Sequence, residues 1–129
     1  MEERNRQGLK KIGIVGPCAA GKSTLINHLE GKFNAQLHHI AQEHSYVQDM
    51  WQRINPPDWL IFLDVSYPVS LVRRAYLNWT PEEYQEEQRR LAHARDHADL
   101  YILTDPLSAD QVAEKVTEFL TRVGLSRNS

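Results

Sequence analysis

The sequence has 129 residues, which suffices for one domain but not for two, so we expect a single domain over residues 1–129. Hydrophobic residues make up 41% of the chain, charged residues 25%, and the net charge is −2, which fits a globular protein and excludes the basic excess of a nucleic-acid-binding surface. No apolar stretch reaches the ~20 residues of a membrane span, and the first residues lack the apolar segment of a secretion signal. Cys18 is the only cysteine, so no internal disulfide can form. We therefore expect a cytoplasmic protein without membrane or nucleic-acid partners.

The first predicted elements are a strand, a glycine-containing loop and a helix. The apolar run at 11–15 predicts a short buried strand that leads directly into Gly16. Over 23–30 the apolar residues follow helical spacing, and Gly31 stands where a C-terminal cap belongs. Residues 35–41 predict a second strand, whose polar residues fit the edge of a sheet better than its centre.

The rest of the chain continues the alternation of strands and helices. The apolar run at 59–63 is typical of a central strand that is covered on both faces. Further elements are predicted as helices at 45–54, 68–76, 80–95 and from 108 onward, and as a last strand at 100–103. This order predicts an α/β fold in which a short parallel sheet of about four strands lies between two layers of helices.

The segment Gly-Pro-Cys-Ala-Ala-Gly-Lys-Ser at 16–23 has the pattern of a phosphate-binding loop. Its two glycines permit backbone angles that turn the amide groups inward around an anion. Lys22 offers a positive charge to the β- and γ-phosphates, and Ser23 offers a hydroxyl to Mg²⁺. We therefore expect Mg·ATP binding. The predicted nucleotide-binding residues of the loop are Gly16, Pro17, Cys18, Ala19, Ala20, Gly21, Lys22, Ser23 and Thr24.

Cys18 admits two interpretations. It is either a small residue that fits the loop, or a redox-sensitive thiol whose pKa the nearby Lys22 and the helix dipole lower. His93 and His97 have the spacing of a metal-binding pair on a helix, but no third ligand accompanies them, so we interpret them as part of a solvated face.

Beyond the loop, the chain resembles a shortened form of the small P-loop kinases, which include the deoxynucleoside, thymidylate and adenylate kinases. Gln42-Glu43-His44-Ser45 resembles the Glu-Arg-Ser segment of the deoxynucleoside kinases. The run 57–66 resembles the strand that leads to their arginine-bearing lid, and 98–113 resembles their last strand, adenine-contacting loop and closing helix. The resemblance implies a P-loop NTPase fold and adenine binding near three residues, Asp105, Pro106 and Leu107.

Phosphoryl transfer needs positioning and charge neutralisation, together with a carboxylate near the metal or the attacking hydroxyl. Glu43 and Asp64 compete for that role, since both are expected at the carboxyl ends of strands beside the loop. We favour Glu43 as general base and Asp64 as metal-shell residue. Arg73 and Arg74 are expected to stabilise the transferring phosphoryl group from a lid.

The pattern favours an ATP-dependent phosphotransferase that acts on a small polar acceptor. It also permits two other functions: a nucleotide-binding module that signals to a partner without transferase activity, and slow hydrolysis with water as acceptor. Between Gly31 and Glu43 the chain lacks the segment with which the kinases bind their acceptor. This difference favours the nucleotide-binding module. The sequence leaves both a monomer and a homodimer open.

Overall fold

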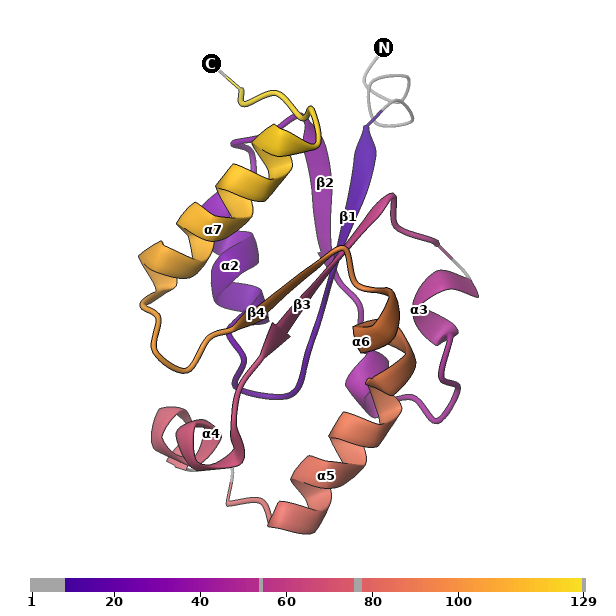
Figure 1. The fold of residues 1–129 in the computed structure, drawn as a ribbon, viewed down its shortest axis with the longest axis vertical. Coiled ribbons are helices and arrows are strands. Elements are labelled where there is room, and N and C mark those ends of the chain that lie inside the picture. Colours follow the sequence, from indigo (N-terminus) through magenta and orange to yellow (C-terminus); the bar gives the residue numbers. More distant parts are fainter. Residues whose placement is uncertain (1–8, 54, 76–77, 129) are drawn as a thin grey trace.

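The computed structural model describes residues 9–53, 55–75 and 78–128. Strands and helices alternate along the chain, as Figure 1 shows. In order they are β1 (Lys10–Val15), α2 (Lys22–Leu29), β2 (Ala35–His39), η1 (Gln42–His44), α3 (Met50–Arg53), β3 (Trp59–Asp64), α4 (Tyr67–Arg73), α5 (Pro81–Arg90), α6 (Ala92–His97), β4 (Leu100–Leu103) and α7 (Ala109–Arg122).

The four strands form one sheet in the order β2-β1-β3-β4, and every neighbouring pair is parallel. The predicted α/β fold with a four-stranded parallel sheet is confirmed. The polar strand β2 lies at an edge and the apolar strand β3 lies inside the sheet, as their compositions indicated. The strand order reverses its direction at β1, because β2 lies on one side of β1 and β3 on the other. Ligands of open α/β sheets bind where the order reverses in this way.

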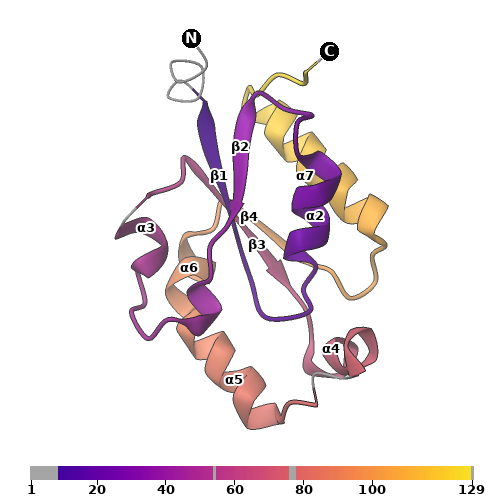
Figure 2. The ribbon, with the colours of Figure 1, turned by 180° about the vertical axis from the view of Figure 1, so that it is seen from behind.

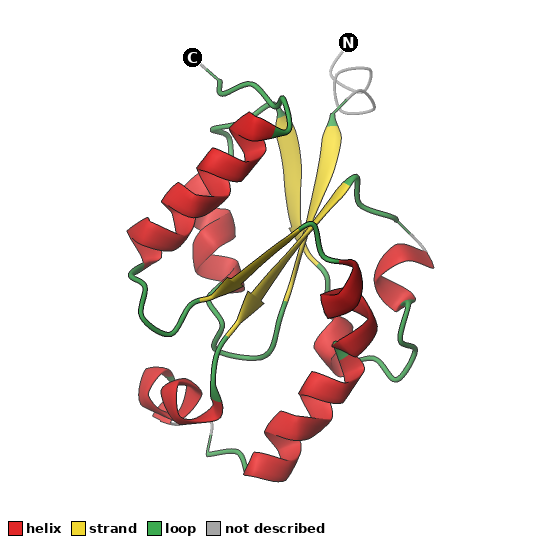
Figure 3. Ribbon diagram, viewed as in Figure 1, coloured by secondary structure: helices red, strands yellow, loops and turns green. Residues whose placement is uncertain are grey.

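Helices cover both faces of the sheet, so the fold has three layers (Figures 1 and 3). In both opposite views, α2 and α7 lie together on one face, and α3, α5 and α6 lie on the other (Figures 1 and 2). Side chains alternate accordingly along β3: Ile61 and Leu63 belong to the apolar cluster under α2 and α7, whereas Leu60 and Phe62 belong to the cluster on the other face. None of the helices that the structure describes is long and apolar enough to cross a membrane.

Three predicted helices have other boundaries in the structure. The helix predicted at 45–54 begins only at Met50, because the side chain of Gln42 accepts from the amide of Trp51 and donates to the carbonyl of Val47. That contact holds the intervening residues as a loop. The helix predicted at 80–95 is interrupted at the fully buried Leu91, which separates α5 from α6. The helix predicted at 68–76 runs from Tyr67 to Arg73, and its predicted last residue lies outside the described residues.

Candidate functional site

The phosphate loop, residues 16–23, connects β1 to α2 at the carboxyl edge of the sheet. Gly16 has a φ of 154°, and a Cβ atom there would lie 1.9 Å from the carbonyl oxygen of Leu63 in β3. The loop therefore packs so closely on the neighbouring strand that only glycine fits at this position. Gly21, with a φ of 98°, turns the chain into α2, whose N-terminus lies at the loop and supplies its positive dipole end.

Lys22 is charged and yet buried, with 7% of its surface exposed. Its ammonium group donates to the carbonyl oxygens of Gly16 and Pro17. It also forms an ion pair with Glu43, in which 2.8 Å separates Nζ from Oε2. Glu43 lies in η1, shortly after β2, so this pair joins the phosphate loop to the end of β2. The structure thus brings these two predicted site residues together.

Glu43 is almost fully buried, and among the described residues its Oε1 atom has no hydrogen-bond partner. Burial alone would raise the pKa of this carboxyl, but the hydrogen bond from His39 and the charge and hydrogen bond of Lys22 outweigh burial and lower the pKa to about 2. The carboxylate is therefore ionised at neutral pH and is a weak proton acceptor. Ser23 lines the same cavity, so its hydroxyl and the unpartnered Oε1 atom are two oxygen donors that fit Mg²⁺.

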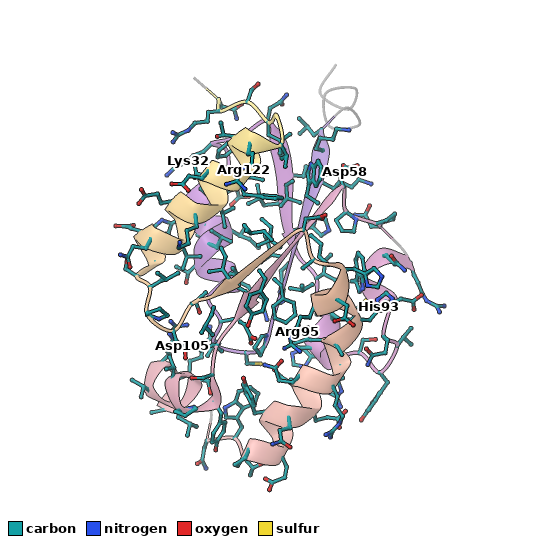
Figure 4. The ribbon with its side chains drawn as sticks, viewed as in Figure 1. Lys32, Asp58, His93, Arg95, Asp105 and Arg122 are labelled. Atoms are coloured by element: carbon teal, nitrogen blue, oxygen red, sulfur yellow. The ribbon has the colours of Figure 1, made fainter. Side chains whose placement is uncertain are left out.

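Asp64, at the end of β3, has both carboxylate oxygens engaged elsewhere. Its four partners are the amide of Val65 at 2.9 Å, Nε2 of Gln88 at 3.0 Å, the hydroxyl of Tyr101 at 2.6 Å and the guanidinium of Arg95 at 3.6 Å. Figure 4 shows Arg95 on the face of the sheet that α5 and α6 cover. Asp64 is not among the described residues that line the cavity beside Ser23. The geometry therefore favours Glu43 over Asp64 as the carboxylate near a bound metal.

Glu87 in α5 reaches the phosphate loop, and sequence analysis missed it. Its carboxylate accepts from the backbone amide of Cys18 at 3.0 Å and from the thiol of Cys18 at 3.2 Å. Its position carried a signal, because Glu87 follows Tyr84 by three residues and precedes Leu91 by four, on the stripe that α5 turns inward. A carboxylate of the protein itself thus accepts a hydrogen bond from a loop amide of the kind that binds phosphate oxygens.

The structure bears on the two interpretations of Cys18, of which only the redox-sensitive one requires a lowered thiol pKa. Burial raises the pKa to about 11, and the hydrogen bond and negative charge of Glu87 act in the same direction. The positive charge of Lys22 lowers the pKa by less than these two effects raise it. The thiol is therefore protonated at neutral pH, which favours the interpretation of Cys18 as an unreactive thiol over that of a redox-sensitive one.

Both predicted lid arginines lie next to the loop, at the end of α4. Arg73 donates to the carbonyl oxygen of Ala19 at 3.1 Å and to the hydroxyl and carbonyl oxygens of Thr104 at 2.8 and 2.6 Å. It therefore holds α4, the phosphate loop and the end of β4 together. Arg74 is exposed and lines the cavity that contains Lys22 and Ser23, where it can approach a bound phosphate.

A second cavity, of about 240 Å³, lies beside the loop. Its apolar wall comes from α2, α7 and the chain between β4 and α7, through Leu25, Val112 and Leu107. Thr24 also lines it, whereas Asp105 is not among the lining residues and accepts from the backbone amide of Ser66 at 2.9 Å. Figure 4 shows Asp105 in the loop that follows β4. The cavity has room for a nucleobase, and threonine and arginine side chains complete its lining. Of the three predicted adenine-contacting residues, only Leu107 is among the lining residues.

The two histidines of α6 pack on each other, with 4.2 Å between their ring centroids. His97 is exposed, as a solvated face requires, but Nδ1 of His93 accepts from the indole of Trp51 in α3 at 3.0 Å. Figure 4 shows His93 on the side of α6 that faces α3. His93 therefore serves the packing of two helices.

A family model described as 50S ribosome-binding GTPase matches residues 11–127, which span the sheet and both helical layers. No curated protein matches the chain. The match confirms the P-loop NTPase part of the predicted resemblance and supports nucleotide binding, but it points to GTPases and gives no support to the small kinases in particular.

Proposed function

Because the chain belongs to the 50S ribosome-binding GTPase family of P-loop proteins, we propose that it is a nucleotide-binding switch whose phosphate loop exchanges the protein's own carboxylates for the phosphates of a nucleotide. One observation carries the proposal. In the structure, Glu87 accepts from the amide of Cys18 and Glu43 pairs with the ammonium group of Lys22. Loop amides and the loop lysine are the groups that hold nucleotide phosphates in P-loop proteins.

Electrostatic repulsion prevents the carboxylates and the nucleotide phosphates from occupying the loop at the same time. A bound triphosphate places several negative charges at the loop, and a buried carboxylate in the same place is repelled. Glu87 must therefore leave the amide of Cys18, and its departure shifts α5. Since α5 contacts η1, which carries Glu43, the two segments move together. Nucleotide binding is thereby converted into a movement of one face of the molecule, which a partner can recognise.

Mg²⁺ is the cofactor we propose for this site. The hydroxyl of Ser23 and the Oε1 atom of Glu43 are the protein groups that would hold it. A bound Mg²⁺ neutralises the phosphate charge. Arg74 would add a second positive charge on the open side of the cavity. Glu43 serves here as a fixed negative charge, because a pKa of about 2 makes it a poor general base.

We propose ATP as the nucleotide, with GTP as the alternative that family membership favours. Guanine presents adjacent N–H donors that a carboxylate satisfies, and burying them without an acceptor is unfavourable. None of the described residues that line the base-sized cavity is acidic. A lining without a carboxylate therefore favours adenine over guanine.

The chemical step we propose is slow hydrolysis. A phosphotransferase that acts on a small polar acceptor is the second candidate, and the position of Arg73 and Arg74 beside the loop favours it. The two differ in the fate of the phosphate. Radiolabelled ATP yields free phosphate in the first case, whereas in the second the label moves to an acceptor from a pool of nucleosides, sugars and vitamins.

Calorimetric titration of the purified protein with ATP and with GTP, each with Mg²⁺, tests the proposal. We expect binding that Lys22→Ala abolishes, and at ligand concentrations near 100 times Kd a stabilisation of about 2.7 kcal/mol. Absence of binding by either nucleotide would refute the proposal. Binding of GTP more than tenfold tighter than ATP would overturn only the choice of base.

A further inference from the structure

Cys18, His44 and Glu87 come from three separate elements, the phosphate loop, η1 and α5. They bring a sulfur, an imidazole nitrogen and a carboxylate oxygen within 4.8 Å of one another. We propose that these three side chains form a binding site for a divalent transition metal of the Zn²⁺ type, with a fourth coordination position open to the adjoining cavity.

The spacing suits a tetrahedral ion. Bonds of about 2.3 Å to sulfur and about 2.0 Å to nitrogen and oxygen place the ligand atoms roughly 3.3–3.6 Å apart. Sγ of Cys18 and Oε2 of Glu87 already lie 3.2 Å apart. His44 is 62% exposed, so its ring is free to turn through the remaining distance.

The donor set selects the kind of metal. A thiolate and an imidazole prefer Zn²⁺ or Co²⁺, whereas Mg²⁺ and Ca²⁺ prefer oxygen donors alone. Two carboxylates lie beside the phosphate loop, since Glu43 pairs with Lys22 and Glu87 accepts from the amide of Cys18, and Glu87 itself supplies the negative charge that faces the ion. Glu43 also lies 3.8 Å from Nε2 of His44, which is too far for a hydrogen bond but places a negative charge beside that ring.

Metal binding replaces the thiol proton of Cys18 by the metal ion and involves no redox step. In the metal-free protein the thiol hydrogen lies between Sγ of Cys18 and the carboxylate of Glu87. Metal binding breaks the S–H bond, forms a metal–sulfur bond and releases that proton to solvent, while His44 contributes a ring lone pair. The bound ion then fixes α5 and η1 on the phosphate loop. Competition between metal and nucleotide follows from the proposed function, but the site itself does not depend on it.

Titration of tag-free protein with Co²⁺, in the absence of nucleotide, tests the site. Cobalt bound to a thiolate gives a sulfur-to-cobalt charge-transfer absorption that oxygen and nitrogen ligands alone do not produce. We expect this band to saturate at one Co²⁺ per chain, to disappear in Cys18→Ser, and to be lost when Zn²⁺ displaces Co²⁺. A protein that binds no Co²⁺, or binds it without this band, would overturn the proposal.

Three single variants and one matched control locate the ligands. Cys18→Ser, His44→Gln and Glu87→Gln should each weaken Zn²⁺ binding at least about tenfold, measured by competition with a chelating dye. His97→Gln should leave the affinity unchanged, because His97 lies on α6 with the other stacked histidine. Unchanged affinity in any of the three variants, or an equal loss in His97→Gln, would overturn the site as built here.

Discussion

The carboxylates of Glu87 and Glu43 compete with a nucleotide for the phosphate loop in the proposed switch. Each binds a group that a phosphate would otherwise bind, and both are almost fully buried. In the proposed switch such contacts compete with the phosphates and weaken nucleotide affinity by the free energy needed to break them. Individual residues therefore set the balance between the two states of the loop.

Replacing Glu87 with glutamine should tighten nucleotide binding. The substitution removes a negative charge that competes with phosphate, at a contact worth about 0.5–1.5 kcal/mol, so we expect Kd to fall by roughly 2- to 12-fold. Glu86→Gln is the matched control, because Glu86 pairs with Arg89 on the same helix and makes no contact with the phosphate loop among the hydrogen bonds and ion pairs of the described residues. Calorimetric titration gives both values. Weaker binding in Glu87→Gln would mean that Glu87 assists the nucleotide.

Glu43 should make the metal-free, nucleotide-free protein sensitive to acid. Its pKa is lowered to about 2 from an ordinary value of 4.5, so it contributes stability above about pH 4.5 that is lost as the pH falls through 2. In Glu43→Gln this contribution is missing. The advantage of the wild type in free energy of unfolding should therefore be on the order of 3 kcal/mol at pH 7 and shrink toward pH 2.

Urea denaturation of both proteins at several pH values measures this difference. Glu30→Gln serves as the control, because Glu30 is exposed at the end of α2. A constant difference between wild type and Glu43→Gln across the acid range would contradict the account of this carboxylate.

At the scale of the elements, the side chain of Arg73 connects α4 to two other parts of the site. Arg73 joins α4 to the phosphate loop and to Thr104 at the end of β4, whereas its neighbour Arg74 points into the cavity. The two arginines therefore differ in their contacts, whereas the sequence placed both on a lid near the phosphates and did not distinguish which of them has a phosphate role.

Arg73→Ala should lower the stability of the nucleotide-free protein by on the order of 1 kcal/mol, since it removes hydrogen bonds to backbone and hydroxyl oxygens. Arg74→Ala should leave that stability unchanged and weaken nucleotide binding instead. Denaturation and titration of the same two variants separate the effects. Equal loss of stability in both would contradict the division of roles.

Elements with strong local signals could be predicted from the sequence. The apolar runs gave β1 and β3, and the capping box of Ser108 and Gln111 gave the start of α7. The start of α3 could not be predicted, because the side chain of Gln42 sets it from nine residues away. The contact between Glu87 and Cys18 joins residues 69 positions apart, so no local pattern specifies it.

At the scale of the whole molecule, the strand order places every group of the site at one edge. The phosphate loop follows β1, η1 follows β2, and α4 follows β3, so the carboxyl ends of three parallel strands deliver the lysine, the glutamate and the arginines (Figure 1). The sequence predicted this edge correctly, because it follows from the alternation of strands and helices. It did not predict that α5 would cover the loop.

Hydrogen exchange with and without bound nucleotide tests the switch most directly. A non-hydrolysable triphosphate with Mg²⁺ should slow exchange of the loop amides at 16–23, which the phosphates then bind. The same ligand should speed exchange across α5, Pro81–Arg90, because Glu87 no longer holds that helix on the loop. Lys22→Ala should show neither change. Slower or unchanged exchange in α5 while nucleotide saturates the wild-type protein would contradict the account.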